Sequence, residues 1–325
     1  MNTPIVLIIF KRSQSVKKII DILRIFKPTN IYVIADGPRE INEKSDCKKA
    51  REEIDKIDWN CSISKNYSLK NLGLKKRFKS GLDWVFENES KAVILEDDCI
   101  PDPSFFKYCD ELLTKYKNNK KILTISGNNF NFTEESELKN SYFFSKYPLI
   151  WGWATWKRTW DLYDEDISDW NINKTKWLDK IYKSKIIKKY WKLIFNKLSK
   201  EEINTWDYQL TYLSLKENGL NIIPSINLVK NIGVDSKSTN INKKSRNTNL
   251  RANKIKELNN LDVNKIHKDD FLLLYNSWFQ NSHNRLINFT NMFCYCSSIL
   301  SDYKLYSIAE QIPFKIPKDC PKLNI

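Results

Sequence analysis

Three acidic residues stand directly behind one short apolar segment of the sequence. Glu96, Asp97 and Asp98 follow residues 92–95, a run that is expected to form a buried strand. Adjacent carboxylates repel one another unless a cation or hydrogen bonds offset the repulsion. Carboxylate oxygens suit Mn²⁺ or Mg²⁺, with the phosphates of a nucleotide completing the coordination shell. The triplet therefore predicts a metal site for a diphosphate; the alternative is an acidic group that only ends the strand and caps the next helix.

Other polar groups follow two further apolar runs. Lys11 and Arg12 come directly after residues 5–10, and Asp36 comes directly after residues 31–35. In a parallel sheet, ligands bind in the crevice outside the carboxyl ends of the strands. We therefore expect the two basic groups, Asp36 and the acidic triplet to converge on one cleft.

The elements that would position these residues alternate along the first 126 residues. Apolar runs predict strands, and apolar residues at helical spacing predict helices between them. The expected strands are 5–10, 31–35, 61–64, 92–95 and 122–126, and the expected helices are 13–26, 43–57, 74–86 and 103–116. Such alternation implies an α/β fold with a mixed, mostly parallel sheet flanked by helices.

The remainder of the chain is more helical. Helical patterns recur over residues 177–198 and 207–217, residues 235–260 are polar and rich in Asn and Lys, and a helical pattern returns over 269–301. We predict one domain over 1–234, with a nucleotide-sugar half over 1–126 and an acceptor half over 127–234. Residues 235–325 are predicted to form a polar linker and a helical C-terminal appendage.

The composition of the chain limits the classes of partner that it could bind. The net charge is +15, from 54 basic and 39 acidic residues, so the chain attracts anions. No arginine-rich arm, zinc-finger spacing or RNA-binding aromatic signature occurs, which disfavours nucleic acid. Seven cysteines without a CxxC pair indicate neither a disulfide framework nor a zinc site. The apolar run 5–10 is too short for a signal peptide or a membrane span, so we predict a cytoplasmic protein whose basic charge suits peripheral contact with a membrane.

Several short stretches, taken together and in this order, resemble GT-A-fold glycosyltransferases. They are Phe10-Lys11-Arg12, residues 34–39 (IADGPR), 71–75 (NLGLK), 95–98 (LEDD) and 103–106 (PSFF). The resemblance covers residues 4–234 and is greatest to bacterial sugar transferases once labelled hemolysin-like, whose WGWATWKR-like stretch matches residues 151–158. It is more distant to N-acetylglucosaminyltransferase I. It implies transfer from a nucleotide sugar, UDP foremost, to a saccharide or lipid-linked saccharide acceptor in surface polysaccharide synthesis.

The resemblance also implies roles for the residues at the strand ends. Asp98 would be the metal-binding carboxylate, with Asp97 and Glu96 near the ribose and the metal shell. Asp36 would meet the nucleotide base and Arg12 the diphosphate. Lys75 and Arg77 are further candidates for phosphate contacts, and the alternative for both is a solvated helix face.

Direct attack by an acceptor hydroxyl requires a general base. Asp207 stands at the start of a predicted helix after Trp206, at the point where the resemblance places a catalytic aspartate, and inversion at the anomeric carbon would follow. The alternative is that Asp207 is a helix N-terminal residue stabilised by the helix dipole.

A cluster of tryptophans offers flat faces for an acceptor sugar. Trp151 and Trp153 could stack on pyranose rings, and Gly152 between them would allow close approach of the backbone to a ligand. The alternative is that both indoles pack in the core.

Two observations limit the assignment. Related bacterial sequences carry a His shortly after the stretch that matches 231–234, whereas here the only histidines are His267 and His283. The alternative function is therefore a non-catalytic nucleotide- or carbohydrate-binding protein on a decayed transferase scaffold. A sugar nucleotidyltransferase would need a glycine-rich loop after the first strand, and residues 10–14 contain no glycine.

Overall fold

The computed structural model describes residues 2–130, 140–173, 176–182, 185–233, 250–255 and 257–258. Within them, eight strands form one sheet in the order β3-β2-β1-β4-β8-β6-β9-β7. Four neighbouring pairs are parallel and three, those that involve β8 and β7, are antiparallel. The expected α/β class, with a mixed and mostly parallel sheet flanked by helices, is confirmed.

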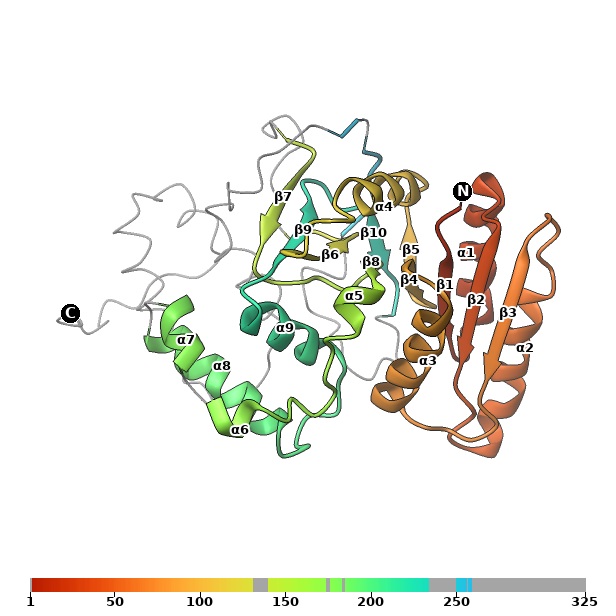
Figure 1. Ribbon diagram of the computed structural model, residues 1–325. Coiled ribbons are helices and arrows are strands. Elements are labelled where there is room, and N and C mark those ends of the chain that lie inside the picture. Colours follow the sequence, from red (N-terminus) through yellow and green to blue (C-terminus); the bar gives the residue numbers. More distant parts are fainter. Residues whose placement is uncertain are drawn as a thin grey trace, which may run out of the picture.

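The first half of the chain follows the predicted alternation (Figure 1). Its strands are β1 (Ile5–Ile9), β2 (Asn30–Ala35), β3 (Ser62–Tyr67) and β4 (Lys91–Glu96). Its helices are α1 (Ser13–Phe26), α2 (Lys44–Ile54) and α3 (Leu74–Asn88), and a short 3₁₀ helix η1 (Ile41–Glu43) precedes α2. β1 is buried along its whole length because helices cover both faces of the sheet.

The second half contains α4 (Ser104–Lys115) and the predicted strand β6 (Ile122–Ser126), and it adds strands that the apolar pattern did not predict. These are β7 (Tyr142–Ser145), β8 (Trp153–Trp156) and β9 (Leu220–Pro224), together with β5 (Cys99–Pro101) and β10 (Val229–Asn231), which pair with each other in a separate ladder. The remaining helices are α5 (Lys157–Trp160), α6 (Trp170–Asn173), α7 (Lys176–Ile181), α8 (Lys185–Leu198) and α9 (Asp207–Lys216).

Two apolar layers hold the helices on the sheet. One face of the sheet packs against α1, α2 and α4, and the other packs against α3, α5 and α9. A third cluster joins α6, α7 and α8 to α9. Figure 1 shows these last helices at the opposite side of the molecule from β1–β3.

Part of the segment predicted as a linker packs against the domain. The Asn253 amide donates to the carbonyl of Asn227 (2.8 Å), and the Ile255 amide donates to Ser104 Oγ (3.0 Å). Ile255 and Leu258 also pack against the core, so apolar burial holds this piece in place. The predicted helical region 269–301 lies outside the described residues, as do His267 and His283. Over the described ranges, no helix is long and apolar enough to cross a bilayer.

Candidate active site

The parallel pairing of β1 and β4 brings the basic and acidic groups together. Ile8 lies beside Glu96 in the ladder, and the Asp97 amide donates to the carbonyl of Ile8 (2.9 Å). The turn after β1 therefore meets the turn after β4. The predicted convergence of Arg12 with the acidic triplet follows from this register.

Arg12 contacts two of the three carboxylates. Its Nη1 lies 2.8 Å from Asp97 Oδ1 and 3.3 Å from Asp98 Oδ2. Asp97 is buried and its second oxygen accepts a hydrogen bond from the Phe10 amide (2.9 Å). Asp97 thus fixes the position of the β1 turn and of Arg12, while the Asp98 carboxylate is the more exposed of the two.

Residues far along the chain complete the surroundings of Asp98. Because β10 pairs with β5, Asn231 lies beside Cys99, and the Ile232 amide donates to the carbonyl of Asp98 (2.9 Å). Asn231 Nδ2 lies 3.4 Å from Asp98 Oδ1, and a Cβ on Gly233 would overlap the Asp98 carboxylate. Sequence reasoning gave these two residues no role. The only signal was that the 231–234 stretch matched the related transferases.

Burial and mutual repulsion raise the pKa values of two carboxyl groups in the acidic cluster, those of Glu96 and Asp98. Burial, then the charge of Asp97, raises the pKa of Asp98 to about 6 against the opposing effect of Arg12. The pKa of Glu96 lies well above its usual value, first because of burial and then because of the charges of Asp98, Asp97 and Asp207. The charge of Asp207 thus contributes to raising the pKa of Glu96, after burial and the charges of Asp98 and Asp97.

Asp207 is the first residue of α9. The Thr205 hydroxyl donates to Asp207 Oδ1, and burial raises the pKa of the Asp207 carboxyl. The preceding Trp206 fixes the start of the helix, since its ring stacks on Phe78 with a centroid distance of 3.5 Å. A carboxylate held on a packed helix end near Glu96 suits proton abstraction at this site.

The carboxylates at the end of β4 suit a metal ion that a bound nucleotide also coordinates. In the part of the chain that the structure describes, no group of three His, Cys, Asp or Glu side chains could hold a metal ion by itself. Arg12 Nη1 nevertheless lies 2.8 Å from Asp97 and 3.3 Å from Asp98, and it opposes the rise in the pKa of Glu96. Asp98 therefore fits Mn²⁺ or Mg²⁺ as one carboxylate ligand, with nucleotide phosphates and water supplying the others.

Asp36 is buried at the end of β2, and its carboxylate holds the loop that follows β3. Asp36 Oδ1 accepts from the amides of Gly37 and Leu72 (both 2.9 Å). Asp36 Oδ2 accepts from the Gly73 amide and from Asn71 Nδ2 (both 3.0 Å). These bonds occupy both oxygens, so any effect of Asp36 on a nucleotide base would pass through the 71–73 loop.

Lys75 and Arg77, both on α3, have different surroundings. Lys75 Nζ lies 3.0 Å from Asp166 Oδ1, so a phosphate would have to replace Asp166 as its partner. Arg77 is buried, and its guanidinium donates to the carbonyl of Ala35 (3.2 Å) and to Asn66 Oδ1 (2.9 Å). Arg77 was predicted either to contact a phosphate or to lie on a solvated helix face, and both predictions were wrong. Its buried guanidinium instead links β2 to β3.

The tryptophan stretch is mainly structural. Trp153 is 1% exposed and lies against Trp206 with a centroid distance of 5.7 Å, so protein covers the face that was predicted to stack on a sugar. Gly152 has φ 64°, and a Cβ there would lie 2.8 Å from Val229 Cγ2, so the close approach is to the core. Trp151 remains half-buried at the sheet edge, where its amide donates to Asn128 Oδ1 (3.0 Å).

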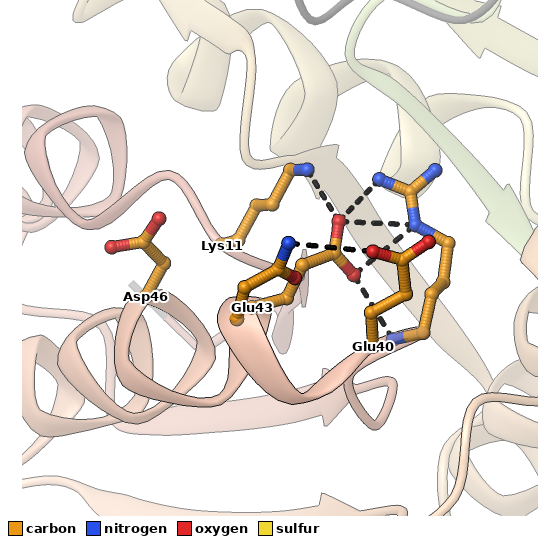
Figure 2. Close-up of a pocket in the computed structure, with 6 residues that line it drawn as sticks. Lys11, Glu40, Glu43 and Asp46 are labelled. Carbon is orange, nitrogen blue, oxygen red and sulfur yellow. Dashed lines mark hydrogen bonds and ion pairs between the residues drawn. The ribbon is translucent and has the colours of Figure 1, made fainter.

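A shallow polar pocket of about 530 Å³ borders the turn after β1. Figure 2 shows Lys11 directed toward Glu43, with Asp46 and Glu40 to either side. Lys11 Nζ lies 2.6 Å from Glu43 Oε1, and Arg39 Nη2 contacts the same oxygen at 2.5 Å. Mainly through Arg39, and also through Lys11, these contacts lower the pKa of Glu43 to about 2.

Comparisons with known proteins give only weak matches. No protein family profile and no curated protein matches the chain. Among solved structures, an apo UDP-glucose pyrophosphorylase is 12% identical over 69% of this chain and 90% of its own, with a TM-score of 0.36. The galactosyltransferase LgtC, bound to donor and acceptor sugar analogs, is 11% identical over 66% of this chain and 70% of its own, with a TM-score of 0.31. These structures are nucleotide-sugar enzymes, at similarities too low to assign a function.

Proposed function

We propose that this chain is a metal-dependent glycosyltransferase. It would move a sugar from a nucleoside-diphosphate sugar, UDP foremost, to a saccharide acceptor with inversion at the anomeric carbon. The observation that supports it is the position of Arg12, whose Nη1 lies 2.8 Å from Asp97 and 3.3 Å from Asp98 where β1 and β4 end side by side, because a cationic group beside carboxylates suits a metal-bound diphosphate.

The chain's own residues supply binding and proton transfer. Asp98 would hold the Mn²⁺ or Mg²⁺ ion, which when bound neutralises charge on the leaving diphosphate. Arg12, held by Asp97, would contact the same diphosphate. Asp97 and Glu96 would lie near the ribose and the metal shell, and Lys75 would meet a phosphate after leaving Asp166.

Asp207 would accept the proton of the attacking acceptor hydroxyl. The oxygen of that hydroxyl forms a bond to the anomeric carbon while the bond from that carbon to the diphosphate oxygen breaks. Because burial raises the pKa of Asp207, its carboxylate is a stronger base than an exposed aspartate. Trp151 at the sheet edge is the remaining candidate for stacking on the acceptor sugar.

A role in surface polysaccharide synthesis, at the cytoplasmic face of a membrane, is part of the proposal. It rests on the resemblance of the motifs over residues 4–234 to the bacterial sugar transferases. A saccharide carried on a lipid would be the acceptor in that setting.

Thermal-shift measurements with a panel of nucleoside diphosphates and their sugars, with Mn²⁺ and with EDTA, test the function. We expect one nucleotide sugar to stabilise the protein only with metal, and that sugar to be transferred to an added saccharide. Stabilisation without turnover of any donor would favour the decayed scaffold. Release of pyrophosphate from a nucleoside triphosphate and a sugar 1-phosphate would instead indicate a nucleotidyltransferase.

A further inference from the structure

Four aliphatic side chains project from the loops beyond β2 and β3. Ile41 is 86% exposed, Leu69 90%, Leu72 44% and Leu74 39%. Seven large hydrophobic side chains are exposed in the described residues, and four of them belong to these two loops. We call this group the apolar rim. Exposed aliphatic residues are normally scattered singly, whereas these four lie in two segments whose backbones approach each other.

Hydrogen bonds fix the backbone of the rim. Arg51 Nη2 donates to the carbonyl of Asp36 (3.0 Å) and to the carbonyl of Ser68 (2.8 Å), so one guanidinium joins the two loops. A Cβ on Gly37 would lie 2.5 Å from the carbonyl carbon of Lys70, which shows how closely the loops approach. The side chain of Asp36 holds the Leu72 amide as well (2.9 Å). The leucines of the rim are therefore presented by a braced backbone.

Basic residues surround the rim. Segments 37–46 and 68–76 contain five basic residues and three acidic ones, a net charge of +2. The basic residues are Arg39, Lys44, Lys70, Lys75 and Lys76, and the acidic ones are Glu40, Glu43 and Asp46. Glu43 pairs with Lys11 and Arg39, and Lys75 pairs with Asp166. The exposed charged residues of the two segments are the basic Arg39, Lys44, Lys70 and Lys76 and the acidic Glu40. The exposed charge beside the aliphatic tips is thus positive.

We propose that the apolar rim docks on an anionic lipid bilayer. Aliphatic tips enter the boundary between headgroups and acyl chains while neighbouring lysines meet anionic headgroups. A protein partner fits less well, because protein interfaces are depleted in lysine and centred on aromatic anchors. The exposed large hydrophobics of the rim are all Ile or Leu.

Docking on this surface has a consequence for the site. The rim follows the carboxyl ends of β2 and β3, which lie on the same sheet edge as the ends of β1 and β4 that carry Arg12 and Asp98. A docked molecule would hold that edge at the bilayer, where a lipid-linked saccharide lies. This consequence rests on the proposed function, whereas the docking itself rests on the rim alone.

Vesicle sedimentation of the full chain tests the docking. The vesicles are phosphatidylcholine alone, or phosphatidylcholine with phosphatidylglycerol, at physiological salt. The test variant is Ile41→Asp with Leu69→Asp, and the matched control is Leu162→Asp with Ile172→Asp, which changes the charge equally at aliphatic residues 50% and 82% exposed elsewhere. We expect the wild type and the control to pellet with the anionic vesicles only, and the rim variant to bind at least about tenfold more weakly.

Equal loss in both double variants, wild-type binding by the rim variant, or no vesicle binding by the wild type would each overturn the docking. So would a self-association in solution that the rim variant abolishes while vesicles bind no protein. Metal-dependent stabilisation by nucleotides is measured on the same samples. Because Ile41 and Leu69 lie outside both the acidic cluster and the 71–73 loop, that signal should persist in the rim variant, which separates failure of docking from failure of the proposed function.

Discussion

Gly233 packs directly against the carboxylate of Asp98, at a distance that leaves no room for a Cβ atom. Its amide donates to Asn231 Oδ1 (2.7 Å), and the same Asn231 side chain reaches Asp98. The segment formed by β10 and the residues after it therefore packs closely against the Asp98 side chain. We infer that Gly233 positions Asp98 for its ligand.

Replacing Gly233 by alanine tests that inference. The added methyl group must displace the Asp98 side chain, so we expect Gly233→Ala to weaken Mn²⁺-dependent nucleotide binding by about 10- to 100-fold, the range typical of residues that orient metal ligands. Calorimetric titration measures the affinity, and the melting temperature without ligand checks the fold. Unchanged affinity in a folded protein would remove Gly233 from this role.

Asp98 itself is expected to be indispensable for metal-dependent binding. Asp98→Asn removes the charge that would meet the cation, and we expect nucleotide binding in Mn²⁺ to fall about 100-fold or more, to the level seen in EDTA. The matched control is Asp58→Asn, at the amino end of β3, where the carboxylate is exposed and pairs with Arg24. Survival of the metal-dependent thermal shift in Asp98→Asn would refute the metal assignment.

Asp207 is expected to affect turnover and not binding. Asp207→Asn keeps the size of the side chain but removes the base, so the transfer rate should fall about 10²- to 10⁴-fold while donor affinity stays within a few-fold. Glu217→Gln, at the other end of α9, is the control for loss of charge on the same helix. If both variants transfer sugar at the wild-type rate, another group is the base.

Two glycines with positive φ should differ in the stability that they contribute. Gly73 (φ 79°) has open space around its missing Cβ, whereas at Gly152 (φ 64°) a Cβ would lie 2.8 Å from Val229 Cγ2. Gly73 lies at φ 79° and ψ 157°, a region open mainly to glycine, so Gly73→Ala adds only backbone strain of about 1–3 kcal/mol. Gly152→Ala adds overpacking of about 1–3 kcal/mol to strain of the same order. Urea unfolding should therefore rank Gly152→Ala as the less stable variant, and the opposite order would contradict the packing argument.

Acid should remove the stabilisation that the ion pairs of Glu43 provide. Arg39 and Lys11 lower the pKa of Glu43 from 4.5 to about 2 in the folded protein. A carboxyl whose pKa is lower when folded stabilises the protein above its unfolded pKa, and loses that effect as pH falls through the folded pKa. The stability difference between wild type and Glu43→Gln should thus be full at pH 6 and vanish between pH 4.5 and 2. The exposed Glu87→Gln provides the control, and a difference that grows in acid would contradict the ion-pair network.

Sequence reasoning located the sheet edge well because its signals are local. Each of the runs at 5–10, 31–35 and 92–95 became a strand, and a parallel register then carried Arg12 to Asp97 without further information. The apolar periodicity also located α1, α3, α4 and α9 within a few residues.

The missed features depend on partners that are distant in the chain. Asn231 and Gly233 meet Asp98 across more than a hundred residues, and no local pattern encodes that contact. Trp153 was misassigned because a tryptophan-rich stretch has the same sequence pattern whether it forms a buried four-residue strand or a sugar-binding surface. For Asp36, the hydrogen bonds that occupy it come from a loop whose course only the fold defines.

The position of β8 also bears on how the chain folds. This strand lies between β4 and β6, although it is made after both of them. A nascent chain that ends before Trp153 therefore has an open edge on β4 and two open edges on β6, because β8 and β9 are not yet made, and each edge can pair with a neighbouring chain. Closure waits for a segment more than fifty residues beyond β4, and such long-range pairing is slow. The period before the two halves join is thus one in which this protein is exposed to aggregation during synthesis, and pairing of β8 covers the open edge of β4 and one of the two open edges of β6.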